Sequence, residues 1–369
     1  MKVPLHGGEV FSASRRLGVP VSSLLDFSAS INPLGPSPNA LRRLRTELSL
    51  IRHYPDSDQQ ELRDLVAKTE NIHPQCILFG NGATQLLHLM ARLLKPRKAL
   101  IVEPGFAEYA TALGAVGCRI HRLQLQPETS FRLERTELFD IIGRKPPDLI
   151  LLGNPNNPTG VAIPSTLLAE LRDRCAKQHI HLVLDESFID FTFEPSLLQE
   201  ASRRPYLFVV RSLTKFWALA GLRLGYVAAQ APLVEKLKAN IEPWSVNTLA
   251  LAAAAASLRD SKYRPRTLAL LRKERAFLHE QLSKLGWLKP CPSVANFLLV
   301  RITAAGISST DLQRRLEDRD ILIRDGSNFP GLGRSYIRVA IRSRPENSRL
   351  IEELRSIGYP PRCSDEAGR

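Results

Sequence analysis

The sequence predicts an α/β fold with two domains: a large domain on a mostly parallel central sheet, and a smaller α+β domain. Between residues 76 and 229, short apolar runs rich in β-formers alternate with helical stretches. This alternation is typical of parallel strands buried on both faces. After residue 248 the pattern changes to helices mixed with a few short strands. A length of 369 residues also suits two domains of about 150 residues each.

The expected elements follow from these patterns. Strands of the large domain are expected at residues 76–79, 99–102, 149–152, 181–184, 207–210 and 223–228, with helices at 83–94 and 165–177. The second domain is expected to have one or two helices within 249–285, strands at 295–301, 320–324 and 335–341, and helices at 309–318 and 345–356.

The chain therefore divides into an arm, residues 1–40, that is part of the small domain, a large domain, 41–245, and a C-terminal small domain, 246–369. We expect the arm to pack on the small domain or to reach a partner subunit. The tail, residues 362–369, is the one segment whose composition indicates disorder.

The net charge of +14 raises the question of an anionic partner. The basic residues are spread along the chain, without zinc-finger spacing, an RNA-binding motif or a long Lys/Arg run. We therefore expect no nucleic-acid partner. A small phosphorylated substrate explains a local basic site better.

The cysteine count indicates a reducing compartment. The five cysteines form no C-x-x-C pair, which argues against a disulfide framework and a metal site and predicts a cytoplasmic protein. Residues 1–8 lack the pattern of a signal peptide, and the longest apolar run, residues 249–256, is too short to span a bilayer. We expect no membrane association.

The main candidate for chemistry is Lys215, which follows the expected strand at 207–210. A surface position is the ordinary interpretation of a lysine, but this one has apolar neighbours such as Phe216. Partial desolvation lowers a lysine pKa, and the neutral amine can then form a Schiff base with an aldehyde. Ser212 and Arg223 lie close enough in sequence to hold a phosphate beside that linkage.

Further polar groups follow the other expected strands, at the sheet edge where open α/β folds bind ligands. Asp185 follows the strand at 181–184 and Asn157 lies in a proline-bracketed turn after 149–152. A helix N-cap for Asp185 and an Asx turn for Asn157 are the alternatives to a binding role.

Two more segments belong to the same set. Gly82-Ala83-Thr84 opens the helix expected at 83–94, and the free N–H groups and dipole of a helix start suit a phosphate dianion. Phe106 follows another strand and either stacks on a ligand ring or packs in the core.

In chain order these segments resemble the fold-type I enzymes of the aminotransferase class I/II superfamily, which depend on pyridoxal 5′-phosphate (PLP). The order is a glycine-rich phosphate loop, a stacking aromatic, Asn-Pro-Thr-Gly, an aspartate, Ser-x-x-Lys and an arginine. The resemblance runs over most of the chain. It implies the PLP-dependent transferase fold, PLP as the cofactor, and no metal.

The resemblance also implies a role for each residue. Lys215 would carry the cofactor, and Asp185 would keep the pyridine nitrogen protonated so that the ring acts as an electron sink. Asn157 would contact the phenolic oxygen. The remaining cofactor-binding residues that the resemblance implies are Gly82, Ala83, Thr84, Phe106, Ser212, Arg223 and Tyr54. Tyr54 resembles the family tyrosine that reaches the cofactor phosphate of the neighbouring subunit, which implies a homodimer with shared active sites.

Two groups within the superfamily compete. Threonine-phosphate decarboxylases convert O-phospho-L-threonine into (R)-1-aminopropan-2-yl phosphate for cobalamin biosynthesis, and histidinol-phosphate aminotransferases are the alternative. The segments that resemble the decarboxylases are residues 6–8, 26–35, 243–247, 321–324, 328–332 and 337–343.

Two positions bear on this choice. The aminotransferases usually have a tyrosine three residues after the pyridine aspartate, whereas this chain has Phe188, as the decarboxylases do. In the opposite direction, the decarboxylases usually have asparagine where this chain has Ser30, whose side chain reaches less far.

The resemblance assigns the substrate to His6, Gly7, Ser30, Asn157, Arg324 and Arg338. Either arginine could instead form a surface ion pair, and the sequence does not tell which arginine meets which anion. We expect a PLP-dependent carboxy-lyase. A PLP-binding regulator would need a DNA-binding domain, for which the roughly 40 residues before the fold are too few. A protein that had lost its chemistry would be expected to lack Lys215.

Overall fold

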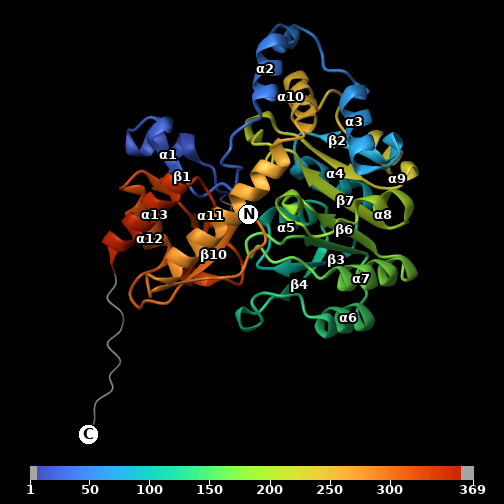
Figure 1. The fold of residues 1–369 in the computed structure, drawn as a ribbon. Helices are drawn as coiled ribbons and strands as arrows, with labels where there is room; N and C mark the ends of the chain where they lie inside the picture. Colours follow the sequence, from blue (N-terminus) through green and yellow to red (C-terminus); the bar gives the residue numbers. More distant parts are fainter. Residues whose placement is uncertain (1–5, 359–369) are drawn as a thin grey trace.

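A seven-stranded sheet dominates the computed structural model, which describes residues 6–358 (Figure 1). In spatial order its strands are β2 (Ile77–Gly80), β8 (Gly225–Ala228), β7 (Leu207–Ser212), β6 (His181–Asp185), β5 (Leu149–Gly153), β3 (Lys98–Glu103) and β4 (Arg119–Gln124). Strand β8 runs antiparallel to both of its neighbours, and the other pairs are parallel. Strands β5 and β7 are buried along their whole length, as the apolar runs at 149–152 and 207–210 predict.

Helices surround this sheet (Figure 1). They are α2 (Pro38–Glu47), α3 (Gln60–Glu70), α4 (Ala83–Leu94), α5 (Ala107–Gly114), α6 (Arg135–Arg144), α7 (Ser165–Lys177), α8 (Leu198–Arg203), α9 (Ala231–Lys238) and α10 (Thr248–Leu258). Local signals fix several starts: Ser37 caps α2, with Pro38 in the first turn, and Asn247 caps α10.

The smaller part of the molecule is an antiparallel sheet with helices beside it. The sheet order is β12 (Arg324–Asp325), β13 (Tyr336–Ala340), β10 (Phe297–Ile302) and β9 (Leu288–Pro290), and the helices are α1 (Val10–Leu17), α11 (Tyr263–Ser283), α12 (Ser309–Glu317) and α13 (Arg344–Ile357). The N-terminal arm joins this part because β1 (Leu25–Asp26) pairs in parallel with β11 (Ile321–Leu322). Within the described residues, no helix is long and apolar enough to cross a bilayer.

Several elements differ from the expected ones. The expected strand at 320–324 is two short strands that pair with different partners, β11 with β1 and β12 with β13. The expected strand at 223–228 begins two residues later, because Arg223 has a left-handed backbone with φ +59°. Strand β4 was not expected: it lies at the sheet edge and is largely exposed, so its sequence is polar.

The domain boundaries stay a prediction. Helix α10 lies just after the predicted boundary at residue 245, and it packs on α2 and α3 (Figure 1). Cys363 and the tail at 362–369 lie outside the described residues.

Candidate active site

The chemistry-bearing residues gather at the carboxyl end of the parallel strands. Asp185 ends β6, Ser212 ends β7, and Lys215 follows three residues after Ser212. Strand pairing places Asp185 directly beside Gly153 of β5 and Val210 of β7. These buried strands therefore fix the spacing of groups that are far apart in sequence.

The amine of Lys215 lies in a crowded polar and aromatic setting. Its Nζ is 3.3 Å from the Ser212 hydroxyl and 5.1 Å from the centre of the Phe188 ring. Burial lowers the pKa of Lys215 to about 8; the negative charge of Asp185 opposes this shift, and the positive charges of Arg223 and Arg338 add to it. Near neutral pH, more of this amine is therefore in the neutral, nucleophilic form than in an ordinary lysine.

An anion cradle forms where α4 begins. Gly82 is the N-cap of this helix, with φ +82°, and a Cβ added there would lie 2.7 Å from Nη2 of Arg223. The Arg223 guanidinium thus lies against the start of the helix. The backbone N–H groups of Ala83 and Thr84, in the first turn, have no hydrogen-bond acceptor within the helix. A helix N-terminus combined with a guanidinium suits a phosphate dianion.

The carboxylate of Asp185 is held at both oxygens. Its Oδ1 accepts the backbone N–H of Ser187 at 2.9 Å, which is the local turn that an aspartate at a strand end commonly forms. Its Oδ2 accepts the hydroxyl of Tyr109 at 2.9 Å, and Tyr109 belongs to α5. Burial, together with the charge of Asp185, raises the pKa of Tyr109 well above its usual value, so the phenol remains a donor. Phe106, the N-cap of α5, packs edge-on against Tyr109 at 5.6 Å between ring centres.

Arg338 of β13 reaches from the smaller part of the molecule to the Asn157 turn. Its Nη1 donates to Oδ1 of Asn157, and its Nη2 donates to the carbonyl of Ser28 at 2.6 Å. Its Nε is buried and has no hydrogen-bond partner among the described residues. Burial lowers the pKa of Arg338 to about 9, and the charge of Arg324 adds to the shift.

Arg324 and Arg338 are direct partners across β12 and β13, so their side chains start on the same face. Both residues are buried, with 7% and 6% of their surface exposed, which argues against surface ion pairs. The Arg324 guanidinium lies over the Phe329 ring at 4.8 Å. Two guanidinium groups that start on one face can bind carboxylate or phosphate groups, so this face is suited to an anionic ligand.

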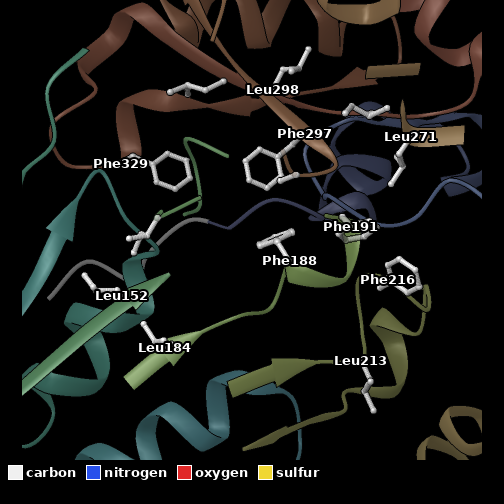
Figure 2. Packing of buried hydrophobic residues seen from close by; sticks show 14 of the residues in the cluster. Leu152, Leu184, Phe188, Phe191, Leu213, Phe216, Leu271, Phe297, Leu298 and Phe329 are labelled. Carbon is white, nitrogen blue, oxygen red and sulfur yellow. The ribbon is translucent and has the colours of Figure 1, made fainter. Parts of the chain in front are cut away.

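Aromatic side chains close the site between the two parts of the molecule. Figure 2 shows Phe188, which follows β6, facing Phe297 of β10, and the two rings meet edge-on at 5.0 Å. The Arg338 guanidinium lies 5.2 Å from the centre of the Phe297 ring. Phe188 therefore presents only apolar atoms to the amine of Lys215.

The N-terminal segment crosses the same region. The His6 ring nitrogen Nε2 is 3.0 Å from a carboxylate oxygen of Glu108 in α5. Gly7 packs so closely on Ser28 that an added Cβ would lie 2.1 Å from the Ser28 carbonyl oxygen. Ser30 is 5% exposed, and its hydroxyl is buried without a hydrogen-bond partner among the described residues.

Tyr54 is placed differently. It is 78% exposed, and its ring stacks on Trp244 with 4.6 Å between centres. Its predicted contact with the cofactor of a neighbouring subunit stays a prediction.

Sequence reasoning missed two residues of the site, Tyr109 and Glu108. Tyr109 lies three residues after Phe106, a spacing that puts two side chains on one helix face, and this was the available signal. Glu108 carried no comparable signal, because its contacts with His6 and His88 join segments far apart in sequence.

The family is decided by similarity over the full chain. The sequence profile described as "Aminotransferase class I and II" matches residues 22–354. The chain belongs to this family. A threonine-phosphate decarboxylase of Salmonella typhimurium is 42% identical, over 95% of this chain and 96% of that protein. An adenosylcobalamin biosynthesis bifunctional protein, CobDQ, of Leptospira interrogans is 31% identical over 98% of this chain and 42% of its own length.

Solved structures of the family have the same architecture. A histidinol-phosphate aminotransferase of Clostridium acetobutylicum superposes with a TM-score of 0.83 at 30% identity, over 90% of this chain and 99% of that one. An L-threonine-O-3-phosphate decarboxylase of Porphyromonas gingivalis superposes with a TM-score of 0.81 at 28% identity and the same coverage. The fold is therefore shared by both enzyme groups, and the backbone alone does not separate them.

The residues of this chain fit PLP, the cofactor of the family. Three features of the site match three groups of the cofactor: the Lys215 amine with its lowered pKa suits the aldehyde, the cradle that a Cβ on Gly82 would fill suits the phosphate, and the buried Asp185 carboxylate can accept the N–H of the pyridine ring. We conclude that the enzyme uses PLP.

Proposed function

We propose that the protein is a PLP-dependent carboxy-lyase that converts O-phospho-L-threonine into (R)-1-aminopropan-2-yl phosphate for cobalamin biosynthesis. The observation that carries the proposal is the 42% identity to the Salmonella typhimurium decarboxylase across nearly the whole of both chains. The similarity to the Leptospira interrogans CobDQ protein supports the link to cobalamin.

Residues at the sheet edge would hold the cofactor. Lys215 would bind its aldehyde, Asp185 would meet the ring nitrogen, and Gly82 with Arg223 would hold the phosphate. When bound, PLP supplies an electron sink that stabilises the carbanion left after a bond at the amino acid's α-carbon breaks.

The protein decides which bond breaks by orienting the substrate. The bond to be cleaved must stand perpendicular to the cofactor ring, so a decarboxylase must hold the carboxylate out of the ring plane. O-phospho-L-threonine carries two anionic groups, and the adjacent Arg324 and Arg338 offer two guanidinium forks on one face. With Asn157 bonded to Arg338, this arrangement can fix both anions at once.

The N-terminal segment would complete the substrate pocket. The buried, unpartnered hydroxyl of Ser30 is available for a substrate oxygen. His6 and Gly7 lie beside α5 and Ser28, where they would cover the site and exclude water.

Assembly and location belong to the same proposal. We propose a homodimer in which Tyr54 serves the partner's site. Exposed apolar residues near Tyr54 support this interface: Leu48 is 55% exposed, Ile51 65% and Trp244 51%. A cytoplasmic location is supported by the cysteines, because the four that the structure describes form no disulfide bond.

The test is a product assay on the purified enzyme with O-phospho-L-threonine, in parallel with histidinol phosphate plus 2-oxoglutarate. We expect carbon dioxide from the first substrate and little glutamate from the second. Unphosphorylated threonine should be a poor substrate, because it lacks one of the two anions. Rapid glutamate formation without carbon dioxide release would instead assign the chain to the histidinol-phosphate aminotransferases.

A further inference from the structure

We propose that Tyr109 is a positioning residue for Asp185, holding the carboxylate directed at the cofactor's ring nitrogen. The inference rests on the role proposed above for Asp185. It is independent of the substrate, because it concerns the cofactor alone.

The contact is built from distant parts of the chain. Tyr109 is 2% exposed, lies in the first turns of α5, and donates its hydroxyl proton to Oδ2 of Asp185 at 2.9 Å. The same helix starts at Phe106, whose ring meets Tyr109 edge-on. Helix α5 thus couples the predicted ring-stacking residue to the predicted pyridine-binding residue.

The sheet leaves room for this phenol at Gly153. Gly153 is the direct neighbour of Asp185 across β5 and β6, and a Cβ added to it would lie 2.9 Å from the Tyr109 hydroxyl oxygen. That distance is too short for two such atoms, so a larger residue at position 153 would displace the phenol. Gly153 does not have a positive φ, so its backbone conformation does not require a glycine. The hydrogen bond from Tyr109 does require one, because a Cβ at this position would displace the phenol.

The hydrogen bond has a defined orienting effect. The Tyr109 hydroxyl donates to Oδ2 of Asp185 and the Ser187 N–H donates to Oδ1, so the carboxylate is fixed in one orientation. Its remaining lone pairs would then be directed at the N–H of the ring nitrogen. Without the phenol the carboxylate could rotate away, the protonated ring nitrogen would lose its acceptor, and the ring would be a weaker electron sink.

The experiment uses Tyr109→Phe, which removes the donor, and Gly153→Ala, which displaces it. Apoenzyme is reconstituted with PLP that carries a heavy nitrogen isotope in the ring, and magnetic resonance reports whether that nitrogen is protonated. We expect the wild type to keep it protonated and both variants to shift it toward the unprotonated form. The cofactor's dissociation constant should also rise, because the carboxylate is no longer held toward the ring nitrogen.

Tyr226→Phe is the matched control, since Tyr226 is also buried and donates to a carboxylate, that of Glu70, at 3.0 Å. It should leave the nitrogen signal and the cofactor affinity unchanged. An unchanged nitrogen signal and dissociation constant in Tyr109→Phe would overturn the proposal, as would an equal loss of affinity in Tyr226→Phe. Because neither readout needs a substrate, a wrong assignment of O-phospho-L-threonine would leave this result intact.

Discussion

The pKa of Lys215 makes a quantitative prediction about how the apoenzyme takes up its cofactor. Only the neutral amine attacks the aldehyde of PLP, so the rate of covalent attachment follows the neutral fraction. Burial lowers the pKa to about 8 from 10.5. A lowered lysine pKa means that the ammonium form is disfavoured, and the neutral fraction therefore rises with pH up to about 8 and then levels off.

The magnitude at pH 7 is large. A pKa of about 8 leaves roughly one amine in ten neutral, whereas an ordinary lysine near 10.5 would have roughly one in three thousand. From this difference in neutral fraction alone, we expect attachment at pH 7 to be faster than with an ordinary lysine by a factor of roughly 300.

The assay is stopped-flow absorbance of apoenzyme mixed with PLP across pH 6 to 10. We expect the logarithm of the rate to rise with unit slope and to bend near pH 8. Replacing Arg338 by glutamine should move the bend to higher pH, because that guanidinium lowers the pKa of Lys215. A rate that continues to rise through pH 10 without a bend would refute the reasoning.

Three further predictions concern assembly, reaction choice and substrate binding. Mixing Tyr54→Ala with Lys215→Ala enzyme should restore some activity, since a mixed dimer with shared sites regains one intact site; activity no higher than that of either parent would contradict sharing. Phe188→Tyr adds a hydroxyl near the Lys215 amine, so it should shift the pKa of the cofactor linkage, measured by absorbance titration, and leave KM for O-phospho-L-threonine nearly unchanged. Arg324→Gln or Arg338→Gln should lower kcat/KM for O-phospho-L-threonine by about ten-fold to over a hundred-fold, the effect of losing about 1.5–3 kcal/mol.

Arg301→Gln is the matched control for the arginine variants. Arg301 lies on β10 of the same sheet but is exposed. It should leave kcat/KM unchanged, and a comparable loss in this variant would point to general destabilisation of the sheet instead of substrate contacts.

Much of the fold could be predicted from local sequence. The expected helices at 83–94 and 165–177 match the bounds of α4 and α7, and the buried strands of the central sheet lie within two residues of their expected positions. These elements have strong periodic or continuous apolar signals because they are packed on all sides. The exposed edge strand β4 was missed for the opposite reason, since its polar residues face water.

Sequence patterns singled out the candidate site residues but few of their contacts. Lys215, Ser212 and Asp185 stood out because each follows an apolar strand, and parallel strands bring such positions to one edge. The pairing of β1 with β11 joins segments about 300 residues apart, and no local pattern encodes it. The hydrogen bond from Tyr109 to Asp185 likewise depends on how α5 packs against β3 and β4, which only the three-dimensional structure reveals.

The central claim is that this enzyme cleaves the bond to the carboxylate and not the bond to the α-hydrogen. The most direct test is to incubate the PLP-loaded enzyme with excess O-phospho-L-threonine in the absence of any 2-oxo acid. A decarboxylase returns its cofactor unchanged after each cycle, so the account predicts many molecules of carbon dioxide per active site and a cofactor that remains PLP. Conversion of the cofactor to pyridoxamine phosphate, with a single turnover and no carbon dioxide, would contradict it.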